Sequence, residues 1–179
     1  MRERSLVFFT LITQSAVSSY IASTGIRLSR DSIQTNAGEQ ILFLRLEIIS
    51  FLLVLIGLVV SLFHLGSPQR AYRAILNVRK SWLSREILFG LLFVALVAIS
   101  IFIQSFSVIC PTFLGLFQIS AIISGIFFII SMARLYQLRT VPAWHSPHTM
   151  VTFLLASASL GTLLSACLIS LSPKNQSLP

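Results

Sequence analysis

The longest stretch without a charged side chain runs from Ile87 to Ala133. An α-helix needs about 20 consecutive apolar residues to cross a membrane, so this stretch is long enough for two spans. The segment between Gln104 and Pro111 is the expected break, because proline interrupts a helix and favours a turn. Such a stretch restricts the protein to helices that satisfy their own backbone hydrogen bonds in lipid.

Three more apolar runs fill most of the remaining sequence: Ser5–Ile26, Ile48–Leu65 and Thr149–Leu171. The basic start of the first run resembles a signal peptide, but the run exceeds a typical signal-peptide core and no clear A-x-A cleavage site follows. We therefore predict an all-α integral membrane protein, a bundle of about five transmembrane helices. It forms one membrane domain, residues 1–179, with spans at about 5–26, 46–65, 86–106, 112–134 and 149–171.

Composition agrees with a membrane protein. The chain is 55% hydrophobic and 10% charged, whereas soluble domains carry about 25% charged residues. Its formal net charge is +8, and the basic residues lie between the apolar runs. They therefore favour anionic lipid headgroups or an acidic partner protein as the binding partner, and no nucleic acid is expected.

Five spans place the two termini on opposite sides of the membrane. We call the N-terminal side "side A" and the other "side B". Side A receives nine Lys and Arg residues and side B receives four. The positive-inside rule, taken alone, places side A in the cytoplasm.

The loop between the second and third predicted spans has its own pattern. Ser67 can cap a helix whose first residue is Pro68, and Arg70, Arg73, Asn77 and Lys80 share one helical face. A short amphipathic helix over about 68–80 is expected to lie in the membrane interface. It either anchors the loop to lipid or docks a partner subunit; the docking residues would be Arg79, Lys80, Arg85 and Trp82.

His64 and Glu86 lie at the side-A ends of two neighbouring spans, at similar depth. Such ionisable groups often have only a structural role. A histidine and a carboxylate at one depth could also accept the protons that a hydroquinone releases on oxidation, since imidazole exchanges protons near neutral pH. Arg70 or Arg73 could stabilise charge on the ring oxygen. Tyr136 could offer a hydroxyl at the same surface.

Several other polar residues have a simpler interpretation. Cys110 and Cys167 are not in metal-binding spacing, so no cluster, zinc or other metal is expected in this protein. Gln14 in the first span needs a partner within the bundle. Ser157, Gly161 and Ser165 recur at fourfold spacing, a pattern that lets helices approach closely, and packing within the bundle itself is the preferred explanation.

The run from Ser61 to Tyr72, with its His64-Leu-Gly-Ser-Pro-Gln-Arg70 core, resembles the DmsC-type membrane-anchor subunits of dimethyl sulfoxide reductases. Glu86, in Leu83-Ser-Arg-Glu-Ile, stands at the family's spacing from His64. Arg134-Leu-Tyr and Thr140-Val-Pro-Ala-Trp give a second match, and Phe9-Thr-Leu-Ile-Thr-Gln-Ser a weaker one.

The resemblance implies an anchor that oxidises menaquinol in anaerobic respiration, in the bacterial cytoplasmic (inner) membrane. Electrons would pass to a four-cluster iron–sulfur subunit and then to a molybdopterin catalytic subunit. The resemblance assigns quinol binding to His64, Glu86 and Arg70, and no haem to this protein. It also implies a periplasmic quinol surface, against the charge count, and an anchor shortened at its C-terminus, because the family's anchors have more than five spans.

Two other functions remain open. One is a structural anchor or assembly protein with an incomplete quinol site. The other is a haem b-type anchor, in which His64 and either His145 or His148 would be the axial ligands. These histidines are not paired within spans at matched depth, which disfavours haem.

Overall fold

The computed structural model describes residues 2–30, 37–62, 77–106, 111–137 and 144–171. These residues form five long α-helices and no strand. The helices are α1 (Arg2–Arg30), α2 (Ala37–Leu62), α4 (Trp82–Phe106), α5 (Pro111–Tyr136) and α6 (Pro147–Leu171). Each is long and apolar enough to cross a membrane. The predicted bundle of five spans is confirmed, and the molecule is a multi-pass membrane protein.

The helix ends differ from the predicted spans mainly at side B. α1 continues to Arg30, and α2 begins at Ala37 rather than near residue 46. Charged residues are expected at the ends of spans, but Arg27 and Glu47 lie inside these helices and form an ion pair with each other. A charge that finds its counter-charge within the bundle does not have to end a span.

The expected interfacial helix over residues 68–80 is described only at its end. Asn77–Lys80 form a hydrogen-bonded turn rather than a helix, with Lys80 N–H donating to the Asn77 carbonyl over 3.2 Å. The helix itself was expected over about residues 68–80, and its other residues lie outside the described part of the chain. The turn leads through Ser81 into α4.

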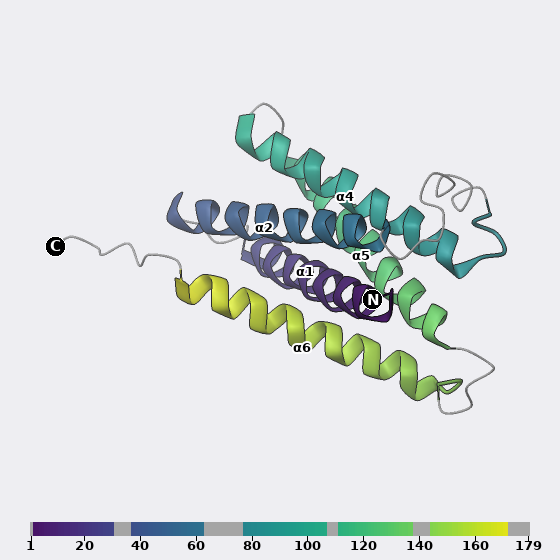
Figure 1. Cartoon of the computed structure of the whole chain (residues 1–179). Helices are drawn as coiled ribbons and strands as arrows, with labels where there is room; N and C mark the ends of the chain where they lie inside the picture. Colours follow the sequence, from purple (N-terminus) through teal and green to yellow (C-terminus); the bar gives the residue numbers. More distant parts are fainter. Residues whose placement is uncertain (1, 31–36, 63–76, 107–110, 138–143, 172–179) are drawn as a thin grey trace.

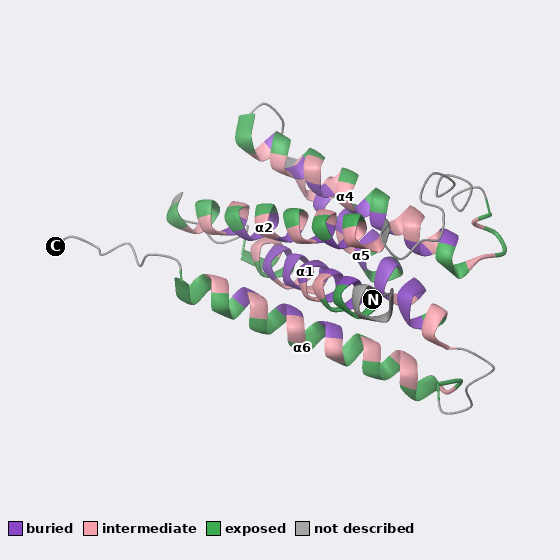
Figure 2. Ribbon diagram, in the orientation of Figure 1, coloured by how far each residue is buried: buried purple, intermediate pink, exposed green. Residues whose placement is uncertain are grey.

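α1 is the central helix of the bundle. It packs against α2 and α6 along its length and also contacts α5, while α4 pairs with α5 (Figure 1). Half of the membrane-spanning window of α1 is buried, against 11% for α6. Figure 2 shows the same contrast between the two helices. α1 is thus shielded from lipid by its neighbours, and α6 faces lipid over most of its surface.

The central position of α1 explains how a helix rich in serine and threonine can span a membrane. Thr10, Thr13 and Ser23 donate their hydroxyl hydrogens to the backbone carbonyls of Leu6, Phe9 and Ser19, over 2.8, 2.6 and 2.8 Å. These bonds satisfy the side chains within the helix itself. The small side chains also leave room for close helix packing.

The small residues of α6 pack onto α1. Ser157 and Ser18 share a hydrogen bond of 2.5 Å between their hydroxyls, and Ser165 and Ser19 share one of 2.8 Å. Gly161 lies directly on the Ser18–Ser19 backbone, where a Cβ atom would have no room. The predicted role of this face, packing within the bundle, is confirmed.

An apolar core fills the centre of the bundle. The ring of Tyr20 meets the ring of Phe93 edge-on at a centroid distance of 5.3 Å, and Val17, Val97 and Phe128 are buried around them. Gln14 is also buried, at 3% exposure, as expected for a polar residue inside the bundle. Large apolar side chains such as Phe102 and Leu155 point outward, as lipid-facing residues do.

Candidate functional site

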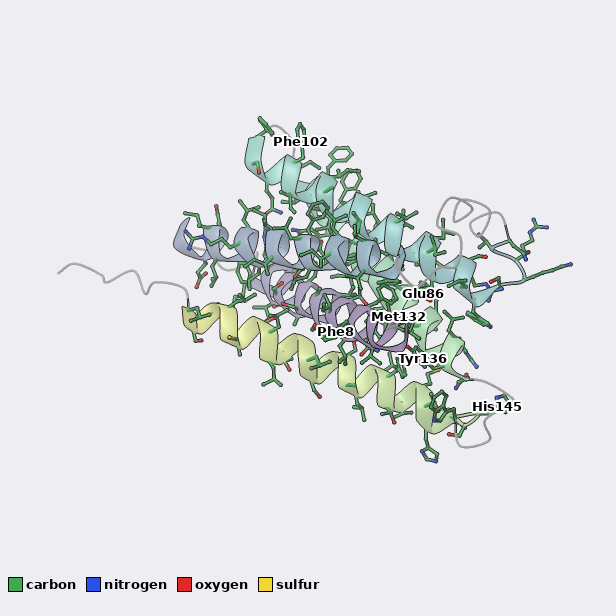
Figure 3. All side chains as sticks on the ribbon, viewed as in Figure 1. Phe8, Glu86, Phe102, Met132, Tyr136 and His145 are labelled. Carbon is green, nitrogen blue, oxygen red and sulfur yellow. The ribbon has the colours of Figure 1, made fainter. Side chains whose placement is uncertain are left out.

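Two of the five predicted quinol residues, Glu86 and Tyr136, are part of the described structure. Glu86 stands in the first turns of α4, and Tyr136 is the last residue of α5. Antiparallel packing of α4 and α5 brings both to the side-A end of the bundle (Figure 3). The other three, His64, Arg70 and Arg73, lie outside the described residues.

Glu86 is buried within α4, with 5% of its surface exposed. In the described part of the chain, no side chain or backbone group donates a hydrogen bond to its carboxyl group. The nearby Arg85 turns away from it, because the Arg85 guanidinium donates to the carbonyls of Val78 and Arg79, both over 3.0 Å. A buried carboxyl group without a donor is costly unless a bound molecule or water supplies one.

Tyr136 and Glu86 lie at the same end of the bundle, on α5 and α4 (Figure 3). The Tyr136 hydroxyl shares a hydrogen bond of 3.0 Å with the Thr10 hydroxyl on α1, and the Tyr136 ring packs on Phe153 of α6 at a centroid distance of 5.0 Å. One turn earlier on α5, Met132 is buried and accepts a weak hydrogen bond from Thr13. Contacts with α1 and α6 thus fix the position of the Tyr136 hydroxyl at the side-A end of the bundle.

The predicted docking residues gather at the start of α4. The Arg85 guanidinium stacks over the Trp82 ring at 4.2 Å, and that of Arg134, from the end of α5, lies 5.7 Å from the same ring. Arg79 and Lys80 are exposed in the preceding turn. Cation–π contacts of this kind hold positive charges in place at the bundle's surface.

The histidines beyond α5 are placed at the surface. His145 and His148 are both exposed at the start of α6, and His145 lies in the connection that precedes this helix (Figure 3). Neither histidine points into the interior of the helix bundle, where a haem would bind between spans. In the described ranges, no group of three or more His, Cys, Asp or Glu residues is arranged to hold a metal ion.

A second polar site, near side B, was not predicted. We call Arg27, Glu47, Gln104 and Gln118 the polar clasp. Arg27 is 3.4 Å from the Glu47 carboxylate and also donates to Gln104. Gln104 and Gln118 donate their amide hydrogens to Glu47 over 2.5 and 3.0 Å. The clasp therefore gives Glu47 three donors and joins α1, α2, α4 and α5.

The sequence matches the model of the DMSO reductase anchor subunit (DmsC) family over residues 1–178. The protein belongs to this family. It is 30% identical over 170 residues to the C chain of the anaerobic dimethyl sulfoxide reductase of Escherichia coli (strain K12), an alignment that covers 94% of the present sequence and 58% of the relative. The corresponding protein of Haemophilus influenzae is 28% identical over 168 residues, with 93% and 58% covered.

A relative with a different name also aligns. The C subunit of the sulfite dehydrogenase of Allochromatium vinosum is 33% identical over 135 residues, which cover 67% of this DmsC-family protein and 40% of the relative. The sequence thus spans less than three fifths of the length of these curated relatives. No solved structure gave a significant match.

Proposed function

We propose that this protein is the membrane anchor of a three-subunit molybdoenzyme reductase and binds menaquinol at side A, against Glu86. The family supports the role of anchor. The observation that supports the quinol site is the buried Glu86 carboxyl group, for which the described residues provide no hydrogen-bond donor. Tyr136 provides a hydroxyl at the same end of the bundle (Figure 3).

Glu86 and Glu47 differ in the hydrogen bonds that their carboxyl groups receive. Both glutamates are buried in spans, at 1% exposure for Glu47 and 5% for Glu86, but Glu47 receives hydrogen bonds from three side chains. Leaving a buried acceptor without its donor costs about 1–3 kcal/mol, and more if the acceptor is charged. A hydroquinone hydroxyl would give Glu86 the donor that Glu47 already has, and that gain would favour binding.

The chemistry requires two proton acceptors and an electron acceptor. Oxidation of menaquinol to menaquinone releases two protons and two electrons. We assign one proton to the Glu86 carboxylate and the other to the His64 imidazole, with Arg70, Arg73 and Tyr136 stabilising the ring oxygens. The electrons would leave to an iron–sulfur subunit and reach the terminal acceptor on a molybdopterin subunit.

The exposed cations at side A fit the docking of that iron–sulfur subunit. The ion pairs among the described residues, Arg27–Glu47 and Arg30–Glu39, both lie near side B. Arg79 and Lys80, which are exposed, and Arg85, which is half-buried and stacked on Trp82, therefore keep their charges available for an acidic partner surface. Complementary charge of this kind steers association and sets orientation.

A structural anchor without quinol oxidation is the second candidate. The alignment covers 58% of each dimethyl sulfoxide reductase relative, so part of a complete site could come from the region of those proteins that is not matched here. This candidate predicts copurification with an iron–sulfur subunit but no binding of a quinol.

Binding of a fluorescent hydroxyquinoline analogue of menaquinol to the protein in lipid nanodiscs tests the proposal. Glu86→Gln should weaken binding about tenfold or more, because hydrogen bonds to a charged group contribute about 1.5–3 kcal/mol. His64→Arg should abolish binding. Glu39→Gln makes the same chemical change at an exposed side-B residue and should have no effect.

Unchanged binding by both Glu86→Gln and His64→Arg would refute the proposed site. Helical content, measured by circular dichroism, checks that each variant is inserted and folded, so that a loss of binding is not confused with a loss of structure.

A further inference from the structure

A cavity opens between the end of α5 and the start of α6, with a volume of about 450 Å³. Its lining is divided into two parts. Arg134, Gln137 and His145 form a polar rim, and Met150, Val151 and Leu154 of α6 form an apolar wall. Neither Glu86 nor Tyr136 lines it, so this cavity is separate from the site proposed for menaquinol and does not depend on that proposal.

The polar rim is held in place by hydrogen bonds. Gln137 accepts from the Arg134 guanidinium over 3.0 Å and donates through its amide to the Ser146 carbonyl over 3.1 Å. The rim therefore ties the end of α5 to the residue that precedes α6. It also places the Arg134 charge beside the positive N-terminal end of the α6 dipole.

We propose that this cavity binds one anionic phospholipid of the side-A leaflet. Its phosphate would meet the Arg134 guanidinium and the His145 ring at the rim, and an acyl chain would lie along the apolar wall. The rim stands where two membrane spans end, which is the depth of lipid phosphates. Basic pockets between spans select anionic headgroups in this way.

Charge distinguishes this occupant from a quinol. The described residues that line the cavity include a guanidinium, an imidazole and an amide, but no carboxylate that could accept a hydroquinone proton. A guanidinium instead matches the oxygens of a phosphate in a bidentate arrangement. Arg134 and His145 are both exposed at this surface, where a lipid headgroup can reach them from the bilayer.

Tryptophan quenching by brominated lipids tests the proposal. The protein has two tryptophans, so Trp82→Phe, which keeps an aromatic ring beside Arg134, leaves Trp144 as the reporter. Trp144 adjoins His145, and its backbone carbonyl accepts a hydrogen bond from the Thr149 hydroxyl at the start of α6. In nanodiscs, brominated phosphatidylglycerol should quench Trp144 about fivefold more effectively per lipid than brominated phosphatidylcholine, as expected for one favourable charge contact.

Arg134→Gln should remove the preference for phosphatidylglycerol, and Arg134→Lys should retain most of it. Arg79→Gln, which removes an exposed charge outside the cavity, should leave the preference intact. Equal quenching by the two lipids in the Trp82→Phe protein would overturn the proposal. This measurement requires no substitution in the cavity. Loss of the preference in an excess of inorganic phosphate, which would indicate a site for free anions, would also overturn the proposal, as would displacement of the lipid by a menaquinone analogue.

Discussion

At the scale of single residues, Glu47 and Glu86 show two ways to bury a carboxyl group in a membrane. Glu47 is enclosed by the polar clasp, and its charge is matched by Arg27 within the bundle. Glu86 has no such partner among the described residues and lies near a surface. Buried ionisable groups in spans are costly, so the one left without a partner is the better candidate for function.

The clasp should respond to mutation as a buried ion pair does. Arg27→Leu leaves Glu47 buried without its counter-charge and should lower the free energy of unfolding by about 3–5 kcal/mol. The double variant Arg27→Leu/Glu47→Leu removes both charges and should recover most of that loss. Reversible unfolding in mixed micelles, followed by circular dichroism, measures both values.

A double variant no more stable than Arg27→Leu would contradict this account of the clasp. It would mean that the loss arises from Arg27 packing rather than from the unpaired Glu47. Arg45→Leu is a suitable control, because Arg45 is exposed on α2 and its removal should change stability little.

The two sites differ in how far they could be predicted from sequence. The positions of Glu86 and Tyr136 at the ends of apolar runs on one side predict that they share a surface, and both lie at the side-A end of the bundle (Figure 3). The clasp cannot be predicted in the same way, because charged residues such as Arg27 and Glu47 usually mark the ends of spans. Pairing of isolated polar residues depends on the rotation of each helix, which apolar runs do not reveal. The available signal for the clasp was that its polar residues lie at comparable depth from side B.

At the scale of the helices, the contact between α1 and α6 depends on small residues. Gly161 lies against the backbone of Ser18 and Ser19, and the two serine pairs flank it. Ser157, Gly161 and Ser165 are the buried residues of α6, so this stripe determines how α6 joins the bundle. Packing and interhelical hydrogen bonds drive such association in lipid.

Gly161→Ala should therefore separate the two helices and destabilise the protein by about 1–3 kcal/mol, the usual cost of overpacking. Gly115→Ala is the matched control: a Cβ atom at Gly115 meets nothing within 4 Å, so stability should stay the same or rise slightly. Unfolding in mixed micelles compares the two. Equal stability of both variants would show that α6 does not depend on this close contact.

The number and order of the helices followed from apolar runs alone, because lipid permits few alternatives to a spanning helix. Their ends did not. α2 begins well before the predicted span, since Glu47 is neutralised inside the bundle. Only the arrangement of neighbouring helices shows which charges are tolerated within a span.

At the scale of the whole molecule, the five spans found in the described residues put the start of α1 and the end of α6 on opposite sides of the membrane. We propose that side A, with the quinol site, faces the periplasm, although the Lys and Arg count favours the cytoplasm. A docking surface can be basic because it binds an acidic partner, whichever side of the membrane it faces. The C-terminus, on side B, would then be cytoplasmic.

Fusions at the C-terminus test this orientation in cells. Green fluorescent protein fused there should fluoresce, and alkaline phosphatase, which needs an oxidising compartment for its disulfides, should be inactive. The opposite pattern would place side A in the cytoplasm and would contradict the periplasmic quinol surface.

We propose that this protein delivers electrons from menaquinol to an iron–sulfur partner, and the reduction of that partner's clusters by menaquinol can be measured. The anchor is purified with its iron–sulfur subunit, menaquinol is added, and cluster reduction is followed by electron paramagnetic resonance. We predict reduction in the parent complex and in Glu39→Gln, and a large loss of rate in Glu86→Gln. Clusters that stay oxidised in an intact parent complex would contradict the claim and leave a purely structural anchor.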